Sequence, residues 1–263
     1  MINMSENKKV FADNLKWYMY INGKDRNDIA QDLGFSYYTV TTWVNGTKYP
    51  RIDKIERLAE YFNISKSQLI EGKELAAVDE RDVLCKAVNM LVDCFERGGK
   101  LLVCGNGGSS ADSAHIVGEL VKGFCKKRPL PKELCETIGT DKLQLGLPAI
   151  DLTAQSAVLS AVANDLGGEL CYAQQVVAYA RPGDVFIGIS TSGNAKNVAL
   201  AMKTAAALGA KTIAMTGAGG GEIAKLCDLW VSVPEKETYL VQEEHIRFYH
   251  QLCLAVENHF FSE

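Results

Sequence analysis

A histidine and a glutamate four residues apart could act together on one substrate. If their segment is helical, His115 and Glu119 share one face of it. An imidazole beside a carboxylate suits proton transfer, and together with a distant histidine the pair forms a reasonable ligand set for zinc or a similar divalent ion. A helical His-Glu pair by itself is more often a solvated surface pair, so its surroundings must decide between these interpretations.

A second group of candidate residues lies near the carboxyl end of the sequence. Gln242, His245 and His250 fall on the last predicted helix, and they include two of the four histidines in the chain. One of these histidines could be the distant histidine that joins His115. We assign no role to His245, and we expect His259 at the surface.

Two loops rich in glycine, serine and threonine, residues 105–110 and 190–194, each lead from a predicted strand into a predicted helix. Backbone N–H groups and hydroxyls in such loops can hold an anion. Neither loop has the Gly-Lys-Ser/Thr of a Walker loop, and the first lacks the third glycine of a dinucleotide fingerprint. Without a lysine or a metal-binding carboxylate, the loops fit a static monophosphate better than a transferred phosphoryl group, and a sugar phosphate is the natural candidate.

The elements that must position these residues alternate between strands and helices from residue 100 onward. Short apolar segments predict strands at 101–104, 185–189, 212–215 and 229–233. Helical patterns begin near residue 109 and at residue 194. This alternation predicts a three-layer αβα domain with a parallel sheet, in which chemistry is expected at the strand ends.

The first seventy residues have a different pattern, which predicts four or five short helices separated by Asn-Gly, Gly and Tyr-Pro breaks. In the middle, Gly34 permits a tight turn between two helices, and Ser36 can cap the second. We place the domain boundary so that a small all-α domain spans 1–71 and the αβα domain spans 72–263. The join has no Pro/Ser-rich stretch, which favours a short, semi-rigid connection.

Charge and composition limit the possible functions. The net charge of −4 argues against a chain that coats nucleic acid along its whole length. Residues 1–71 carry ten Lys/Arg against nine Asp/Glu, which gives +1, and residues 72–263 carry eighteen against twenty-three, which gives −5. All eight cysteines lie in the second part without a C-x-x-C pair, so we expect reduced thiols. With 47% hydrophobic residues and no apolar run of membrane length, we expect a globular, cytoplasmic protein without a membrane segment.

About sixty of the first seventy residues resemble the helix-turn-helix domain of the Cro/phage-repressor family, including the Gly-x-x-x-Pro at 46–50. The resemblance implies DNA binding, with base contacts from the second helix of the motif and phosphate contacts from basic residues around it. The residues concerned are Tyr37, Tyr38, Thr41 and Thr42 for bases, and Lys24, Lys48 and Arg51 for phosphates. The alternative is a helical module for dimerisation or protein contact, because +1 is a weak charge for DNA binding.

Residues 78–261 closely resemble the sedoheptulose 7-phosphate isomerases of the SIS sugar-isomerase family. The resemblance rests, in order, on Gly-Asn-Gly-Gly-Ser at 105–109, Asp112, His115, Glu119, Asn-Asp at 164–165, Ser-Thr-Ser-Gly-Asn at 190–194, and Gln-Glu-x-His-x4-His at 242–250. It implies an SIS fold, a homotetramer, and conversion of sedoheptulose 7-phosphate to D-glycero-D-manno-heptose 7-phosphate through an enediol, for heptose biosynthesis.

The resemblance also implies roles for individual residues. A zinc or similar divalent ion is implied at His115, Glu119, Gln242 and His250. Glu119 and His250 are the implied acid/base residues. The substrate-binding residues implied are Ser190, Thr191 and Ser192 for the phosphate, and Asn106, Gly107, Gly108, Ser109, Asn164, Asp165 and Gln242 for the remainder.

Helix geometry complicates this ligand set. Gln242 and His250 are eight residues apart, and eight residues advance a helix by about 12 Å. Either the helix starts after Gln242, or one ligand comes from a neighbouring subunit. Two positions also depart from the family pattern and could change substrate choice. Ala195 stands where a phosphate-binding serine or equivalent is expected, and Tyr239 stands where some members carry an acidic residue.

The leading hypothesis is therefore an isomerase with an added helix-turn-helix domain. The alternative is a sugar-phosphate-responsive, DNA-binding transcription regulator with the SIS domain as its sensor, because SIS regulators share this domain order. A catalytically silent scaffold predicts lost metal ligands, and the ligands are present.

Overall fold

The computed structural model describes residues 4–71 and 76–261, and its internal contacts divide the chain into two compact units, Met1–Arg81 and Asp82–Phe261. This division falls ten residues after the boundary that we placed at residue 71. Among the described residues, no helix has both the length and the apolar character needed to cross a membrane.

The described part of the first unit consists of short helices around a small core. Their bounds are α1 (Met4–Ile21), α2 (Arg26–Asp32), α3 (Tyr37–Val44), α4 (Ile52–Tyr61) and α5 (Lys66–Ile70). The predicted turn between α2 and α3 is present, because Gly34 has a left-handed φ of 62° and Ser36 Oγ accepts the Thr39 N–H at 3.1 Å. The helices enclose buried Phe11 and Leu15, among other apolar side chains.

The second unit is built on a five-stranded sheet in which all strands are parallel, in the order β2-β1-β3-β4-β5. The strands are β1 (Leu101–Gly105), β2 (Ala149–Asp151), β3 (Val185–Ile189), β4 (Lys211–Thr216) and β5 (Leu229–Ser232). Its helices are most of α6 (Ala76–Glu96), which crosses the division between the units, and α7 (Gly108–Val121), α8 (Lys132–Ile138), α9 (Ser156–Asp165), α10 (Cys171–Tyr179), α11 (Lys196–Ala207) and α12 (Thr238–Phe260), with 3-10 turns η1 (Gly168–Leu170) and η2 (Ile223–Lys225).

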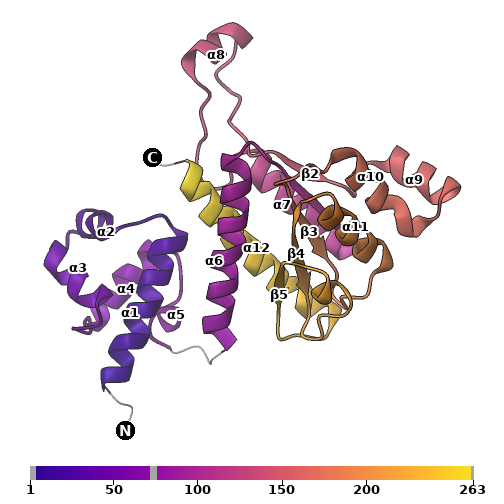
Figure 1. The fold of residues 1–263 in the computed structure, drawn as a ribbon. Coiled ribbons are helices and arrows are strands. Elements are labelled where there is room, and N and C mark those ends of the chain that lie inside the picture. Colours follow the sequence, from indigo (N-terminus) through magenta and orange to yellow (C-terminus); the bar gives the residue numbers. More distant parts are fainter. Residues whose placement is uncertain (1–3, 72–75, 262–263) are drawn as a thin grey trace. The chain divides into compact units, whose positions relative to one another are not determined.

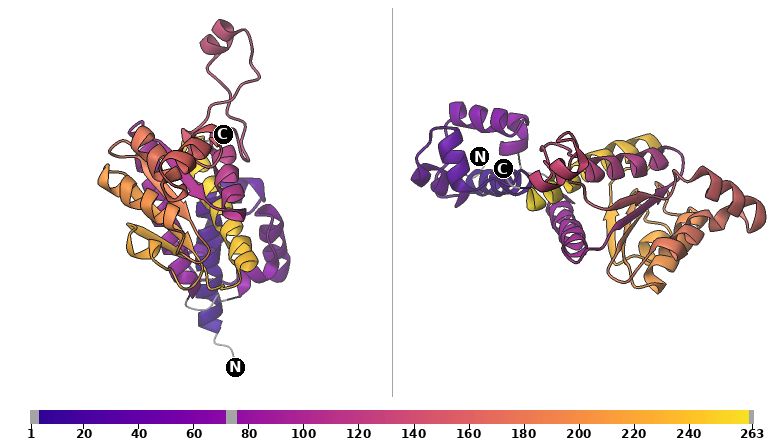
Figure 2. Two further views of the ribbon diagram at one scale, coloured as in Figure 1. Left: turned by 90° about the vertical axis from the view of Figure 1, so that its right-hand side faces the viewer. Right: turned by 90° about the horizontal axis from the view of Figure 1, so that it is seen from above.

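Helices cover both faces of this sheet, so the predicted three-layer αβα architecture is confirmed (Figures 1 and 2). Helix α7 packs on β1 and against α12 on one face, and α10 and α11 pack together on the other. Strands β1 and β3 are buried at every position, which explains their continuous apolar sequences. The edge strand β2 has only three residues, and the sequence pattern did not indicate it.

The strand order reverses direction between β1 and β3. From β1 the chain moves outward to β2, and it then returns to the other side of β1 to form β3. Ligands of open parallel sheets bind at such a switch point, beyond the carboxyl ends of the strands. The two loops rich in small residues follow β1 and β3, so the topology brings them together at this point.

Candidate active site

A pocket of about 370 Å³ lies at the carboxyl ends of β1 and β3. In-register pairing of Gly105 with Ile189 brings the two loops side by side. The lining residues are Asn106, Gly107, Gly108, Ser109, Ile189, Ser190, Thr191, Ser192, Ala195, Thr238 and Gln242. Eight of the predicted substrate-binding residues therefore line one pocket, although the sequence places them in three distant segments.

The pocket suits an anion because three helices begin at it. Helix α7 starts at the lining residue Gly108, α11 has the lining residue Ala195 as its N-cap, and α12 starts at the lining residue Thr238. Free N–H groups and the positive ends of helix dipoles both favour negative charge. The lining contains no charged side chain, so hydroxyls, amides and helix ends supply the attraction. Sequence reasoning missed Thr238, whose signal is a hydroxyl in the first turn of the last helix.

Gln242 reaches the pocket from α12 and lies across the start of α7. A Cβ atom added to Gly108 would overlap the Gln242 side-chain amide in its present position, so the amide would have to move aside. Asn106 is fixed from the opposite side, because its side-chain amide exchanges two hydrogen bonds of 2.9 Å with Asn197. Tyr172 also donates its hydroxyl to Asn106 Oδ1 at 3.2 Å.

The predicted His115–Glu119 pair is in contact on α7, where His115 Nε2 lies 3.0 Å from Glu119 Oε1. His115 Nδ1 lies 2.9 Å from the hydroxyl of Tyr249 on α12. The ring of His250 is 5.0 Å from the His115 ring, centroid to centroid, and 5.6 Å from that of Phe124. The structure therefore brings His115, Glu119 and His250 together between α7 and α12, with Tyr249 as a partner that sequence reasoning missed.

Burial controls the titration of several groups in this cluster. It lowers the pKa of His250, which the neighbouring His115 lowers further and Glu119 opposes. A neutral imidazole is therefore available near pH 7 to accept a proton. Burial also raises the pKa of Asp112 to about 6, against the effect of the Tyr249 hydroxyl and of His115. The pKa of Tyr249 is raised by burial and by Asp112, so Tyr249 keeps its proton.

Tyr249 anchors the inner side of the His115 ring. The Tyr249 hydroxyl lies 2.9 Å from His115 Nδ1 and 3.4 Å from Asp112 Oδ1. His115 Nε2 faces the Glu119 carboxylate, and this contact requires a proton or a cation between the two atoms. Two ligands of one zinc ion lie about 3 Å apart, given bonds of about 2 Å. The His115–Glu119 pair fits a zinc ion on this ground.

The complete predicted ligand set is not assembled within one chain. Helix α12 runs unbroken from Thr238 to Phe260, so the alternative in which it starts after Gln242 is wrong. Gln242 lies at the pocket, and His250 lies two turns further along the same helix. Among the described residues, no cluster of three His, Cys, Asp or Glu side chains is arranged to hold a metal ion. The other alternative, a ligand from a neighbouring subunit, stays a prediction.

Other residues singled out in the sequence lie elsewhere. Asn164 and Asp165 do not line the pocket, and they lie exposed at the end of α9, hydrogen-bonded to each other at 2.7 Å. Tyr239 is 61% exposed and also lies outside the lining. His259 is at the surface as predicted, where it meets Glu96 at 2.9 Å.

His245 is fully buried on α12, and both of its ring nitrogens lack a hydrogen-bond partner among the described residues. Burial lowers its pKa to about 4.

In the first unit, α3 presents part of the predicted DNA-reading face. Tyr37 and Tyr38 are 50% and 68% exposed, and Thr41 is half-buried. The prediction that Thr42 lies on the exposed face is wrong. Thr42 is buried, and its hydroxyl donates to the Thr39 carbonyl at 2.7 Å, because the helix turns this position toward the core.

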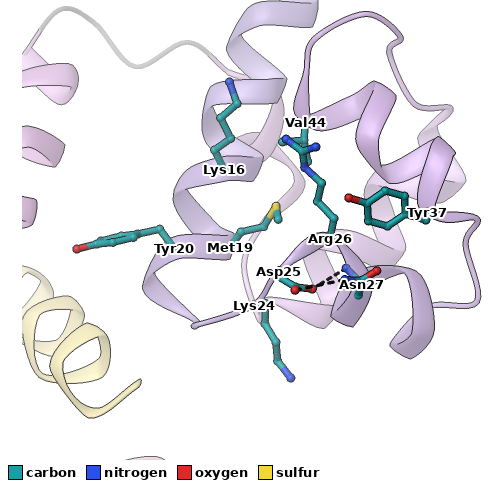
Figure 3. Close-up of a pocket in the computed structure, with 9 residues that line it drawn as sticks. All are labelled: Lys16, Met19, Tyr20, Lys24, Asp25, Arg26, Asn27, Tyr37 and Val44. Atoms are coloured by element: carbon teal, nitrogen blue, oxygen red, sulfur yellow. Dashed lines mark hydrogen bonds between the residues drawn. The ribbon is translucent and has the colours of Figure 1, made fainter. Parts of the chain in front are cut away.

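Basic side chains lie on both sides of α3. Lys48, Arg51 and Lys54 line one hollow beside Tyr38 and Thr39. Lys16, Lys24 and Arg26 line another beside Tyr37, and Figure 3 shows the Arg26 side chain extending between Tyr37 and Val44. Lys16, Lys24 and Lys54 pair with Asp13, Asp32 and Asp53, which agrees with the small total charge of +1.

Comparisons with known proteins agree with both units. The SIS domain model matches residues 60–217, and the model of the Cro/C1-type HTH DNA-binding domain matches residues 14–73. The phosphoheptose isomerase of Nitratidesulfovibrio vulgaris is 44% identical over 165 residues, which cover 63% of this chain and 72% of the relative. The phosphoheptose isomerase of Geotalea daltonii is 43% identical over 180 residues, which cover 68% of this chain and 85% of the relative. The structure of the phosphoheptose isomerase from Neisseria gonorrhoeae matches with a TM-score of 0.58 and 34% identity, over 76% of this chain and 98% of that one.

Proposed function

The chain belongs to the phosphoheptose isomerases of the SIS family, and from this premise we propose that it converts sedoheptulose 7-phosphate to D-glycero-D-manno-heptose 7-phosphate. The observation that carries the proposal is the position of two sites along α7. Its first turn lines the anion pocket, and His115 and Glu119 follow on the same helix. About 10 Å of helix separates Gly108 from His115, which suits a sugar chain that carries its phosphate far from its carbonyl.

The reaction moves a proton between two adjacent carbons. Glu119 takes the proton from the carbon next to the carbonyl, an enediol forms, and the proton returns to the neighbouring carbon. His250 moves protons among the substrate oxygens, since burial keeps its imidazole neutral. Ser190, Thr191 and Ser192 hold the phosphate and thereby fix the chain in position.

The residues that would hold a zinc or similar divalent ion are His115, Glu119 and His250, with Gln242 contributed between subunits. Such an ion, when bound, supplies polarisation of the substrate carbonyl. A neighbouring subunit is needed for this set, because one chain separates Gln242 from His250 on a single helix, and the family resemblance implies that the assembly is a homotetramer. Asn164 and Asp165 are assigned to the sugar hydroxyls by family resemblance. A cytoplasmic location is part of the proposal and agrees with eight free cysteines.

The test is incubation of the purified chain with sedoheptulose 7-phosphate and zinc in D₂O, followed by NMR. Aldoheptose formation together with deuterium at the exchanged carbon is expected. Glu119→Gln, prepared in parallel, should show neither signal and controls for host isomerases. Absence of turnover with zinc supplied, or equal turnover in Glu119→Gln, would overturn the proposal.

We propose a second function for residues 1–71, the binding of double-stranded DNA. The observation that favours it is the exposed face of α3 between two groups of basic side chains, because a helix in the major groove has phosphates on both sides. The isomerase would then also act on an operator in response to sugar phosphate.

Selection from a random duplex library at low salt tests DNA binding without a known operator. An enriched sequence whose affinity changes with added sedoheptulose 7-phosphate supports the regulatory function. Enrichment without that response supports DNA binding alone. No enrichment at low salt argues for the dimerisation or protein-contact alternative.

A further inference from the structure

Arg128 and Glu257 form a buried ion pair at the far end of α7 and α12, and we infer that this pair positions Glu119 and His250 for proton transfer. Arg128 Nη2 lies 2.8 Å from Glu257 Oε1, and both side chains are fully buried. Neither residue lines the pocket or takes part in the proposed chemistry. The inference rests on the proposed isomerase function and adds two positioning residues to it.

Arg128 holds the end of the helix that carries Glu119. Its Nη1 donates to the Leu120 carbonyl at 2.6 Å, and its Nη2 donates to the Glu119 carbonyl at 3.1 Å. The last carbonyls of a helix have no partner within the helix, so groups from outside it satisfy them and fix their direction. The Leu120 carbonyl also accepts the Leu147 N–H at 2.9 Å, so Arg128 shares this carbonyl. The backbone of Glu119 itself is thereby bonded to Arg128.

Glu257 holds the loop that follows α7. Its carboxylate accepts the N–H groups of Phe124 at 2.9 Å, Cys125 at 2.8 Å and Lys126 at 3.2 Å. It also accepts Arg128 Nε at 2.9 Å, so four donors converge on one side chain. The backbone of the loop is therefore fixed to α12 through this carboxylate, and Arg128 is fixed with it. The Lys126 ammonium adds a second link, because it donates to the carbonyl of Phe261, at the end of α12, at 2.7 Å.

The same pair is linked to His250 by two routes. Glu257 follows His250 by seven residues on α12, which places both on one face of that helix. The Phe124 ring, whose backbone N–H is held by Glu257, lies 5.6 Å from the His250 ring. Loss of the pair therefore releases the backbone behind Glu119 and the ring beside His250 together.

Stability alone does not account for such a pair. Removing two charges from water is costly, and well-packed apolar side chains in their place are often as stable or more so. Apolar contacts do not fix the orientation of neighbouring polar groups. A planar guanidinium does, because its hydrogen bonds hold two carbonyls and a carboxylate at once. Catalysis by positioned groups depends on such accuracy, since a displacement of about 1 Å can cost about a hundredfold in rate.

A second ion pair, at the amino ends of β1 and β3, provides a matched control. Asp184 is 2% exposed and pairs with Lys100 at 2.7 Å. It also accepts the N–H groups of Lys100 and Arg181 at 2.9 and 2.8 Å. This pair precedes β1 and β3, whereas the active site follows them, so Asp184→Asn should weaken the fold without moving Glu119 or His250.

The experiment compares Glu257→Gln, Arg128→Lys and Asp184→Asn with the wild type, at a temperature where circular dichroism shows each to be folded. Glu257→Gln and Arg128→Lys should each lower kcat about tenfold or more. They should change the KM for sedoheptulose 7-phosphate less than about threefold, because other elements form the phosphate pocket. Asp184→Asn should leave kcat unchanged despite a lower Tm. Arg128→Lys keeps a cation against Glu257 and decides the question if Glu257→Gln does not fold.

Failure of the proposed function and failure of the positioning role give different results. A wild type without turnover overturns the proposed function itself. The positioning role is overturned if the wild type turns over substrate and the kcat values of Glu257→Gln and Arg128→Lys fall no further than that of Asp184→Asn. The pair then has a structural role only.

Discussion

His115 Nε2 lies 3.0 Å from Glu119 Oε1 on the first helix after β1, with the His115 side chain 44% exposed and the Glu119 side chain 22% exposed. The contact is neither a core hydrogen bond nor a free surface pair. The other nitrogen of His115 is held by Tyr249, which is fully buried. A pair that is anchored on one side and open on the other is suited to receive a ligand, which favours the ligand-binding interpretation over a solvated surface pair.

Glu119→Gln should lower kcat by at least about a hundredfold, because the amide cannot take a proton from carbon. KM should change little, since the phosphate pocket lacks Glu119. Steady-state kinetics with sedoheptulose 7-phosphate measures both constants. Glu136→Gln, on the exposed helix α8, is the control and should match the wild type.

Gly108→Ala should raise KM about tenfold or more, because the added methyl group occupies the place of the Gln242 amide. Gly118→Ala is the matched control on the same helix, since nothing lies within 4 Å of its added Cβ. That control should keep KM and gain up to about 1 kcal/mol of stability from helix propensity. Equal KM values in the two variants would contradict the assigned place of Gln242.

Ala195→Ser should lower KM a few-fold, about two to five times, because it adds a hydroxyl both to the phosphate pocket and to the N-cap of α11. Tyr239→Asp changes the other residue that departs from the family pattern. It should leave KM unchanged, because Tyr239 lies outside the pocket lining. Isothermal titration with inorganic phosphate measures the affinity directly, and a larger effect of Tyr239→Asp would contradict this ranking.

His245 makes the second unit sensitive to acid. Burial lowers its pKa to about 4, below the value of about 6.5 in an unfolded chain. As the pH falls, the unfolded state binds the proton first. The stability from this group is therefore complete above about pH 6.5 and is lost as the pH falls toward about 4, by up to about 3 kcal/mol.

Urea titrations of the wild type and of His245→Gln at about pH 7 and about pH 5 isolate this group. The wild type should lose about 2 kcal/mol more stability than His245→Gln, because the raised pKa of Asp112 acts in the opposite direction in both proteins. His259→Gln, at an exposed position on the same helix, is the control and should lose as much stability as the wild type. A wild-type slope that persists in His245→Gln would assign the effect to another group.

Lys48→Gln should weaken DNA binding by a similar factor for all sequences and reduce the slope of log affinity against log salt by about one, as expected for a phosphate contact. Lys48 lies beside Tyr38, with its ammonium 5.6 Å from the ring centroid. Fluorescence anisotropy at several salt concentrations measures the slope. Lys66→Gln is the control, because Lys66 pairs with Glu56 at 2.7 Å.

Local patterns were sufficient to predict most of the fold. Continuous apolar runs predicted β1 and β3, since strands covered on both faces need apolar side chains at every position. Gly34 and Ser36 predicted the turn between α2 and α3, because φ preference and capping act within a few residues. The strand β2 gave no such signal, since its three residues are ordered by their pairing with β1.

The sequence by itself determined which residues are neighbours along one helix, and it therefore identified His115 and Glu119. Only the tertiary structure decided which residues from distant segments join them. Tyr249 reaches His115, and Glu257 reaches Arg128, through the packing of α12 on α7, which no spacing rule contains. Tertiary packing also turned Thr42 into the core and separated Gln242 from His250 along one unbroken helix. The physical reason is that helix periodicity is local, whereas the choice of facing helix depends on burial summed over the whole unit.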